Sequence, residues 1–180
     1  AWDAYDEVER TRICTITTRL PGWRVDRVYE DGTIGDYRKD GTRRARCLEA
    51  PGAPAVIHED GCNCGYRLVR DVYTLLQYVR IQGRAAEDTL AWGHDVRLRG
   101  MDRMTHRGFD PGLRGFVLTR AVGTGHAASV NDPTDPPGTV RVTATRLAEV
   151  YVPQHYFGEP LPASLPLLIR SKYEVPVTRM

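Results

Sequence analysis

A short stretch rich in cysteine constrains the fold of this chain more than any other sequence feature. His58, Cys62 and Cys64 lie within seven residues, and Cys47 precedes Cys62 by fifteen. Zinc is held by four nitrogen or sulfur ligands at the corners of a tetrahedron. These four residues therefore predict a structural zinc site, which would join the end of a strand, a loop and the start of a helix.

The spacing of Cys62 and Cys64 leaves other interpretations open. Alternate residues of an extended chain point in opposite directions, so a turn at Asn63 is required before both thiolates can reach one ion. The cysteines could instead be ordinary buried thiols, a redox-active pair or disulfide partners, and disulfides are disfavoured in a cytosolic chain. If zinc is bound, four protein ligands leave no open position, and the ion would stabilise structure without doing chemistry.

The first third of the chain has the pattern of a small antiparallel meander. The dipeptides Asp-Gly at 31–32 and at 40–41 are strong hairpin turn signals, and Pro-Gly at 21–22 is another turn signal. Apolar and polar residues alternate between these turns, as expected of half-buried strands. The strands are predicted before residue 20 and near 23–29, 33–38 and 43–48.

From Tyr66 onward the apolar spacing changes to three and four residues, which predicts one main amphipathic helix over about 66–81. Further strands are expected at 90–100 and 115–123, followed by a long loop at 123–138. Residues 139–153 predict a strand and then a helical turn or a second strand. The fold class is thus α+β: a strongly bent antiparallel sheet or small β-barrel with the main helix packed on it.

The length of the chain suits one domain with a tail. We expect a single α+β domain over 1–153, carrying the Cys/His cluster, and a proline-rich extension over 154–180 that packs on the domain or on a partner. No run of about 20 apolar residues is present to cross a membrane, and the acidic, polar start is unlike a signal peptide. These features predict a cytoplasmic protein with no membrane partner. They do not indicate an oligomeric state.

The basic residues are unusual in type. The chain has 25 basic and 23 acidic residues, and Lys39 and Lys172 are the only lysines. A high-GC genome, which favours arginine codons, explains this bias, whereas phosphate recognition is the sharper interpretation because arginine binds phosphate through two hydrogen bonds. The best nucleic-acid footprint is a stripe of four arginines: Arg97, Arg99, Arg103 and Arg107.

No motif in the sequence is specific enough to name a reaction or to assign catalytic residues. His94 and Asp95 follow a Trp-Gly pair on a predicted strand, and His126 lies in the 123–138 loop. A histidine acts as a base only when its partner lies within hydrogen-bond reach. These three residues form the alternative hypothesis, a pocket of a small enzyme acting on nucleotides or nucleic acid.

Several motifs occur together in residues 22–95. They are a Gly-Trp-Arg-Val strand from Gly22, the loop from His58 to Tyr66 with Cys-x-Cys-Gly, a helix, and an Ala-Trp-Gly strand from Ala91. This order resembles a group of uncharacterised actinobacterial and actinobacteriophage proteins. The second half departs from their pattern, because His94 and an arginine-rich insertion follow the Trp-Gly pair. The resemblance implies no activity.

We therefore expect a non-enzymatic binding or regulatory protein, which contacts nucleic acid or a host protein. The resemblance implies an actinobacterial or phage setting, and the Cys/His cluster predicts stabilisation by zinc. A charge close to neutral means that nucleic-acid binding requires arginines gathered on one face.

Overall fold

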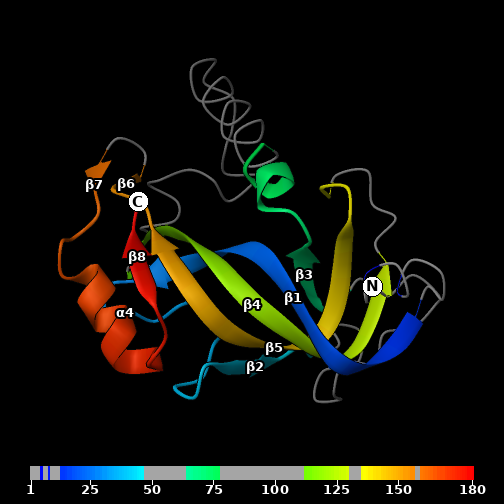
Figure 1. The fold of residues 1–180 in the computed structure, drawn as a ribbon. Coiled ribbons are helices and arrows are strands. Elements are labelled where there is room, and N and C mark those ends of the chain that lie inside the picture. Colours follow the sequence, from blue (N-terminus) through cyan, green and yellow to red (C-terminus); the bar gives the residue numbers. More distant parts are fainter. Residues whose placement is uncertain are drawn as a thin grey trace.

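Two long antiparallel strands, β1 (Ile13–Tyr29) and β4 (Leu113–Ser129), run along the whole length of the fold (Figure 1). The structure is a computed structural model, and it describes residues 5, 8, 13–46, 64–77, 112–129, 135–156 and 159–180. The third long strand, β5 (Thr139–Val152), pairs with β4 in antiparallel register. The remaining elements are β2 (Thr42–Arg44), β3 (Tyr66–Val69), β6 (His155–Tyr156), β7 (Glu159–Pro160), α4 (Leu165–Tyr173) and β8 (Val177–Arg179).

The pairing of the strands bends the sheet strongly. β1 pairs with β4, β4 with β5, β5 with β3, and β3 returns to β1. The contact between β3 and β1 consists of the single register pair Trp23 and Val69, so the sheet is not a clear barrel. β2 and β8 extend β5 on the outside of this arrangement, and β8 is parallel to it. The prediction of a bent, mostly antiparallel sheet is therefore confirmed.

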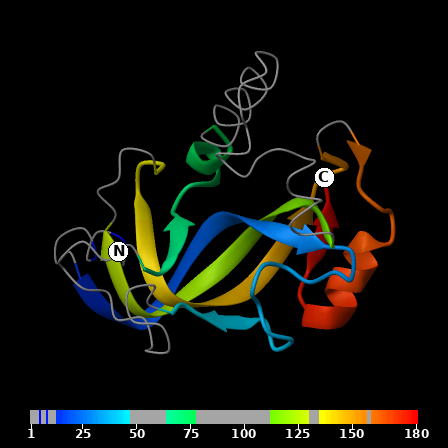
Figure 2. The same ribbon diagram turned by 180° about the vertical axis from the view of Figure 1, so that it is seen from behind.

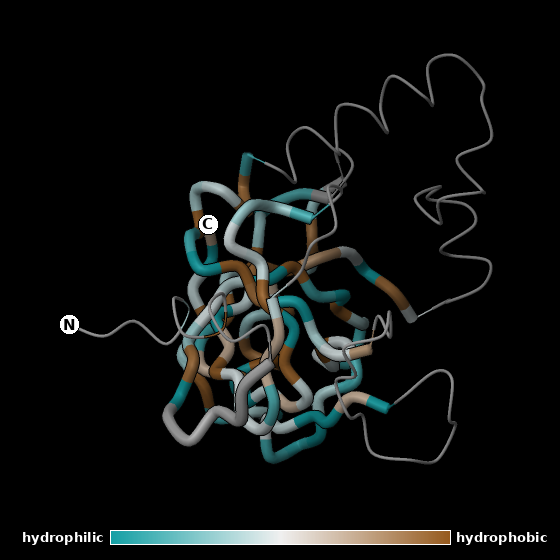
Figure 3. Tube along the Cα trace, turned by 90° about the vertical axis from the view of Figure 1, so that its right-hand side faces the viewer, coloured by the Kyte–Doolittle hydropathy of each residue, from teal (hydrophilic) through white to brown (hydrophobic). Residues whose placement is uncertain are grey.

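Two apolar clusters lie on the inner face of the sheet, one at each end. Figure 3 shows short hydrophobic segments interspersed with hydrophilic ones along the described chain. The first, called the α4 core, comprises Val28, Ile34, Tyr37, Val117, Leu147, Val150, Val152, Leu161, Leu165, Ile169 and Tyr173. The second, called the N-terminal core, comprises Tyr5, Val8, Leu20, Leu68, Ala121, Ala127, Val140 and Val142. Alternation explains why the strand residues of both clusters share this face, because every second residue of a strand faces inward.

The prediction of one main helix over 66–81 is wrong, because the described residues hold a short helix at 72–77 and a second, longer one in α4. Residues 66–69 form β3, and the helix begins only at residue 72 and is described as far as 77. Leu68 and Val69 fit helical spacing, but four backbone pairs with β5 hold this segment extended. Short apolar runs fit the spacing of either a helix or a strand. Here the pairing with β5 makes the segment a strand. Residues 78–81 lie outside the described residues.

The turn predicted at 21–22 is also wrong, because β1 continues straight through it. A Cβ on Gly22 would lie 2.5 Å from the hydroxyl of Tyr5 and 2.8 Å from the Cβ of Leu68. Gly22 thus provides space for close packing within a strand rather than freedom for a turn. Pro21 is tolerated because it is exposed, and its carbonyl accepts a hydrogen bond of 2.7 Å from Tyr5.

The two Asp-Gly turns are confirmed, but they do not make a meander. Gly32 and Gly41 have positive φ angles of 81° and 74°, the backbone conformation that favours glycine. The expected strand at 33–38 is reduced to one bridge between Ile34 and Val28. β2 then pairs with β5, a distant strand, instead of with its neighbour in sequence.

The loop predicted over 123–138 begins as strand, because β4 continues to Ser129. Gly125 and His126 form a bulge between β4 and β5, because the register shifts between Thr124 and Ala127. Gly125 has a φ of 83°, and a Cβ there would lie 2.4 Å from the Thr143 hydroxyl. Residues 139–152 form one strand without a helical turn.

The last segment packs against the sheet through α4 and β8, on the left in Figure 1 and on the right in Figure 2. Leu165, Ile169 and Tyr173 lie one turn apart on α4 and are all buried in the α4 core. The Tyr173 hydroxyl accepts a hydrogen bond of 3.0 Å from the backbone N–H of Ile34. Among the described helices, none has the length and apolar content needed to span a membrane.

Candidate functional site

A belt of polar side chains separates the two apolar cores on the inner face. It consists of Arg24, Asp26, Arg43, Thr119 and Thr145, which come from four strands. Asp26 lies at its centre and is only 3% exposed at its side chain. Its oxygens accept hydrogen bonds from Arg24 Nε at 2.8 Å, Arg43 Nη1 at 3.0 Å and Thr119 Oγ1 at 2.6 Å. A buried carboxylate with these partners is well satisfied.

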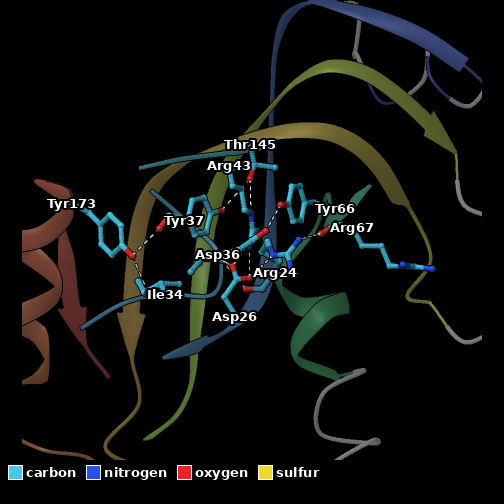
Figure 4. Close-up of polar contacts among 11 residues, drawn as sticks. Arg24, Asp26, Ile34, Asp36, Tyr37, Arg43, Tyr66, Arg67, Thr145 and Tyr173 are labelled. Atoms are coloured by element: carbon cyan, nitrogen blue, oxygen red, sulfur yellow. Dashed lines mark hydrogen bonds and ion pairs between the residues drawn. The ribbon is translucent and has the colours of Figure 1, made fainter. Parts of the chain in front are cut away.

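The Arg43 guanidinium is sandwiched between two tyrosine rings (Figure 4). Its central carbon lies 3.9 Å from the ring centre of Tyr37 and 4.1 Å from that of Tyr66. The edges of the guanidinium donate to Asp26, to Thr145 Oγ1 at 2.8 Å and to Asp36 at 3.2 Å. A planar cation suits this position because it can stack on both faces and bond along its rim at the same time.

The charges in the belt favour the charged forms of both Asp26 and Arg43. Burial alone would raise the pKa of Asp26, but the positive charges of Arg24 and Arg43, with hydrogen bonds from Thr119 and Arg43, outweigh it and lower that pKa. The pKa of Arg43 is raised, since the nearby Asp26 carboxylate outweighs the effect of burial. Both groups are therefore charged at neutral pH. The two arginines of the belt share Asp26, and Asp36 at its edge supplies a second carboxylate to Arg43, so we assign the belt a role in stabilising the fold.

Asp36 covers this sandwich from the solvent side, with 61% of its side chain exposed. One carboxylate oxygen accepts from Arg43, and the other accepts a short hydrogen bond from the Tyr66 hydroxyl. Burial and this bond to Asp36 raise the pKa of Tyr66. Asp36 thus joins the loop after β1 to strands β2 and β3.

The opposite face of the same strands has a different character. In an antiparallel ladder, directly paired residues project to the same side. Ala144 of β5 pairs with Arg44 on one side and with Thr124 of β4 on the other, so these three form one row across three strands. Arg146 lies two residues further along β5, beside Thr42. Ala144 is the shortest side chain in this group, and the surface is hollowed above it.

This depression, called the Ala144 hollow, has a volume of about 400 Å³. The described residues that line it are Arg38, Asp40, Thr42, Arg43, Arg44, Thr124, Ala144, Thr145 and Arg146. All three residues of β2 belong to its lining. β2 lies on the side of the sheet away from the helix at 72–77 (Figures 1 and 2). Arg43 and Thr145 turn their side chains inward to the polar belt, so the exposed lining is formed by the other residues.

Three exposed arginines give the Ala144 hollow its charge. Within the described part of the chain, the side chains of Arg38, Arg44 and Arg146 make no hydrogen bond and no ion pair. Asp40 is the only acidic residue among the described lining, and its Oδ1 accepts from Thr42 Oγ1 at 2.6 Å and from Thr42 N–H at 2.9 Å. An excess of positive charge therefore faces solvent, where it can bind an anion.

The carboxylate of Asp40 is held by hydrogen bonds within the turn that precedes β2. The hydrogen bonds from the Thr42 hydroxyl and N–H lower the pKa of its carboxyl, and the charges of Arg38 and Arg146 act in the same direction. Asp40 thus closes the turn before β2, as aspartate commonly does, while leaving the three arginines available.

Comparison with family models, curated proteins and solved structures gave no match.

The predicted zinc ligands are only partly described. Cys47, His58 and Cys62 lie outside the described residues, whereas Cys64 is buried just before β3, with its carbonyl accepting a hydrogen bond of 3.2 Å from Arg141. Within the described ranges, no three histidine, cysteine or acidic side chains come together as metal ligands would. The zinc site stays a prediction.

The other predicted site residues also lie mostly outside the described residues. The four arginines Arg97, Arg99, Arg103 and Arg107 lie outside the described residues, as do His94 and Asp95. His126 is exposed on β4, where its backbone N–H donates to Thr143 Oγ1 at 3.0 Å. Thr124 of the same strand lines the Ala144 hollow, and His126 is not among the described lining.

The Ala144 hollow itself was missed by sequence reasoning. Arg44 lies in the Arg-Arg pair that follows the second Asp-Gly turn, and this pair was the available signal. Its partner Arg146 is 102 residues away and joins it only through the pairing of β2 with β5.

Proposed function

We propose that this chain is a non-enzymatic binding protein, and that it contacts nucleic acid through the Ala144 hollow. The observation that supports this most is the convergence of Arg38, Arg44 and Arg146 on one concave surface with no ion-pair partner in the described part of the chain. Leaving three cations of like charge close together is unfavourable for folding, and it is useful when an anion binds between them.

The geometry favours phosphate as the anion. Arginine offers a planar fork of donors that matches two oxygens of one phosphate. The hydroxyl of Thr124 lies in the same lining, and hydroxyls are common phosphate contacts. Nucleic acids present phosphates in series, which allows several arginines to bind at once.

Binding is tested by fluorescence anisotropy with labelled 20-nucleotide single strands and 20-base-pair duplexes over a series of salt concentrations. We expect binding whose affinity falls steeply with salt, since each phosphate contact releases counterions. The double variant Arg44→Gln/Arg146→Gln should lose about tenfold or more in affinity. Its salt slope should fall by about one for each arginine removed.

A matched control separates local contacts from overall charge. The double variant Arg19→Gln/Arg27→Gln removes two exposed arginines of β1 that do not line the Ala144 hollow. Its net charge equals that of the first variant. We expect its affinity to stay within about twofold of the parent protein. Equal losses in both variants, or no binding by the parent, would overturn the proposed function.

We also propose that the chain binds one structural zinc ion through Cys47, His58, Cys62 and Cys64. Four ligands of this type would hold the ion tightly. Metal analysis of protein purified without added zinc should give one zinc per chain. Metal-free protein in which all four cysteines of the chain titrate as thiols would contradict this proposal.

A further inference from the structure

The lining of the Ala144 hollow differs from that of a site that reads bases. Its exposed described residues carry guanidinium groups, threonine hydroxyls, one carboxylate and a methyl group. Among them is no aromatic ring on which a base could stack and no asparagine or glutamine that could bond a base edge. Single-stranded bases are held mainly by stacking, and adenine is read mainly by amide side chains. The lining thus suits phosphate and sugar groups.

The two tyrosine rings that contact Arg43, a residue of the lining, are already occupied. Tyr37 and Tyr66 stack on the Arg43 guanidinium on the inner face, so they serve the polar belt. The Tyr66 hydroxyl is bonded to Asp36, and the Tyr37 hydroxyl accepts from Thr145 at 3.3 Å. A base entering the Ala144 hollow would meet none of these faces.

The positions of the arginines fit one phosphate at the centre. Arg44 and Arg146 are diagonal neighbours across β2 and β5, and such neighbours are about 7–8 Å apart at their Cα atoms. Ala144 is directly opposite Arg44 and two residues from Arg146 on β5, and Thr124 pairs with Ala144 from the other side. Two long cationic side chains that flank one methyl group can grip different oxygens of a phosphate seated above Ala144.

The arginine surface continues beyond the Ala144 hollow. Arg46 is exposed two residues after Arg44, about 6.6 Å further along the extended chain. The backbone N–H of Ala45 between them donates to Thr143 at 2.9 Å, which keeps this segment extended beside β5. A ligand longer than the Ala144 hollow therefore gains a further cation, whereas a single nucleotide does not.

We infer that the Ala144 hollow binds the phosphodiester backbone of a polynucleotide and does not select for base sequence. This inference rests on the proposed function and specifies what the nucleic-acid site recognises. Ala144 is the residue that determines the fit, because a larger side chain would occupy the space for the phosphate without changing any charge.

The first test uses the unchanged protein and three labelled 20-nucleotide strands: oligo-dT, oligo-dA and a mixed sequence. We expect dissociation constants within about threefold of one another and binding at least tenfold weaker for a mononucleotide. A preference above tenfold for one sequence would overturn the inference and leave the proposed function intact. No binding to any strand would instead overturn the proposed function itself.

The second test places a larger side chain at position 144, in the Ala144 hollow. Ala144→Leu keeps every charge, and we expect it to weaken binding to all three strands about tenfold and by the same factor. Ala163→Leu is the control, because Ala163 is exposed and does not line the Ala144 hollow. Circular dichroism and urea titration verify folding of both variants. Unchanged affinity of folded Ala144→Leu would show that the arginines act as a flat patch, which contradicts the inference.

Discussion

Arg43 and Arg44 are adjacent in the sequence and chemically identical, yet they lie on opposite faces of the sheet. Arg43 is 2% exposed at its side chain and is enclosed by two carboxylates, a threonine and two tyrosine rings. Arg44 is exposed and has no side-chain partner in the described part of the chain. The alternation of a strand produces this difference.

The comparison shows how one strand can serve stability and binding separately. The desolvation of a buried charge is offset only when its partners are buried with it, and Arg43 has those partners. An exposed charge contributes little to folding, so Arg44 is free to be selected for binding. Substitutions on the face of Arg43 should therefore change the free energy of unfolding. Substitutions on the face of Arg44 should change the affinity for nucleic acid.

The largest effect is expected from Asp26→Asn. This change leaves the buried Arg43 and the half-buried Arg24 without their main counter-charge, and breaking a buried pair typically costs about 3–5 kcal/mol. Urea denaturation measures the loss. Asp36→Asn is the matched control, because Asp36 bonds the same Arg43 but is 61% exposed, and it should cost less than about 1 kcal/mol. Similar losses for both would contradict the difference between buried and exposed partners.

Arg43→Lys should come next. Lysine keeps the charge but lacks the planar group that stacks on two rings and bonds along its rim, so we expect a loss of about 2–3 kcal/mol. Arg44→Lys, the neighbouring control, should change the free energy of unfolding by less than about 0.5 kcal/mol. If both variants unfold at the same urea concentration as the parent, the polar belt does not stabilise the fold as described.

The contribution of Asp26 should depend on pH. Its pKa is lowered in the folded protein below the ordinary value of 3.8, so its stabilisation is present above that value and is lost as pH falls through the folded pKa. The difference in unfolding free energy between the parent and Asp26→Asn should therefore narrow below about pH 4, by at most about 1.4 kcal/mol per pH unit. A difference that stays constant down to pH 3 would contradict the lowered pKa.

Local turns were predictable from the sequence, whereas strand partners were not. The two Asp-Gly turns require a positive φ at glycine, which is a property of the dipeptide itself. Pro21 and Gly22 gave a similar signal, but Gly22 is needed for contact with Leu68, which is distant in sequence. The same limit explains β3, where pairing with β5 prevailed over helical spacing.

The candidate site was hidden for the same reason. The near-neutral net charge indicated that nucleic-acid binding would require arginines on one face. The stripe predicted from spacing, from Arg97 to Arg107, lies outside the described residues. Arg44 and Arg146 meet through a ladder that joins residues about a hundred apart. One sequence contains no direct information on that pairing, because alternation fixes which face a residue takes and leaves its partner strand open.

The substitution with the smallest expected effect on stability tests most directly whether the two faces of the sheet act separately. Tyr66→Phe keeps the ring that stacks on Arg43 and removes the hydroxyl that bonds Asp36, so we expect a loss of about 0.5–1 kcal/mol in unfolding free energy. In a double-mutant cycle with Asp36→Ala, which removes the acceptor of the Tyr66 hydroxyl, the coupling energy should equal most of this loss. Tyr66 pairs with Val142, whose side chain faces the N-terminal core, so affinity for a 20-nucleotide strand should stay unchanged. A loss of affinity as large as that of Arg44→Gln/Arg146→Gln would mean that the polar belt and the Ala144 hollow act as one site.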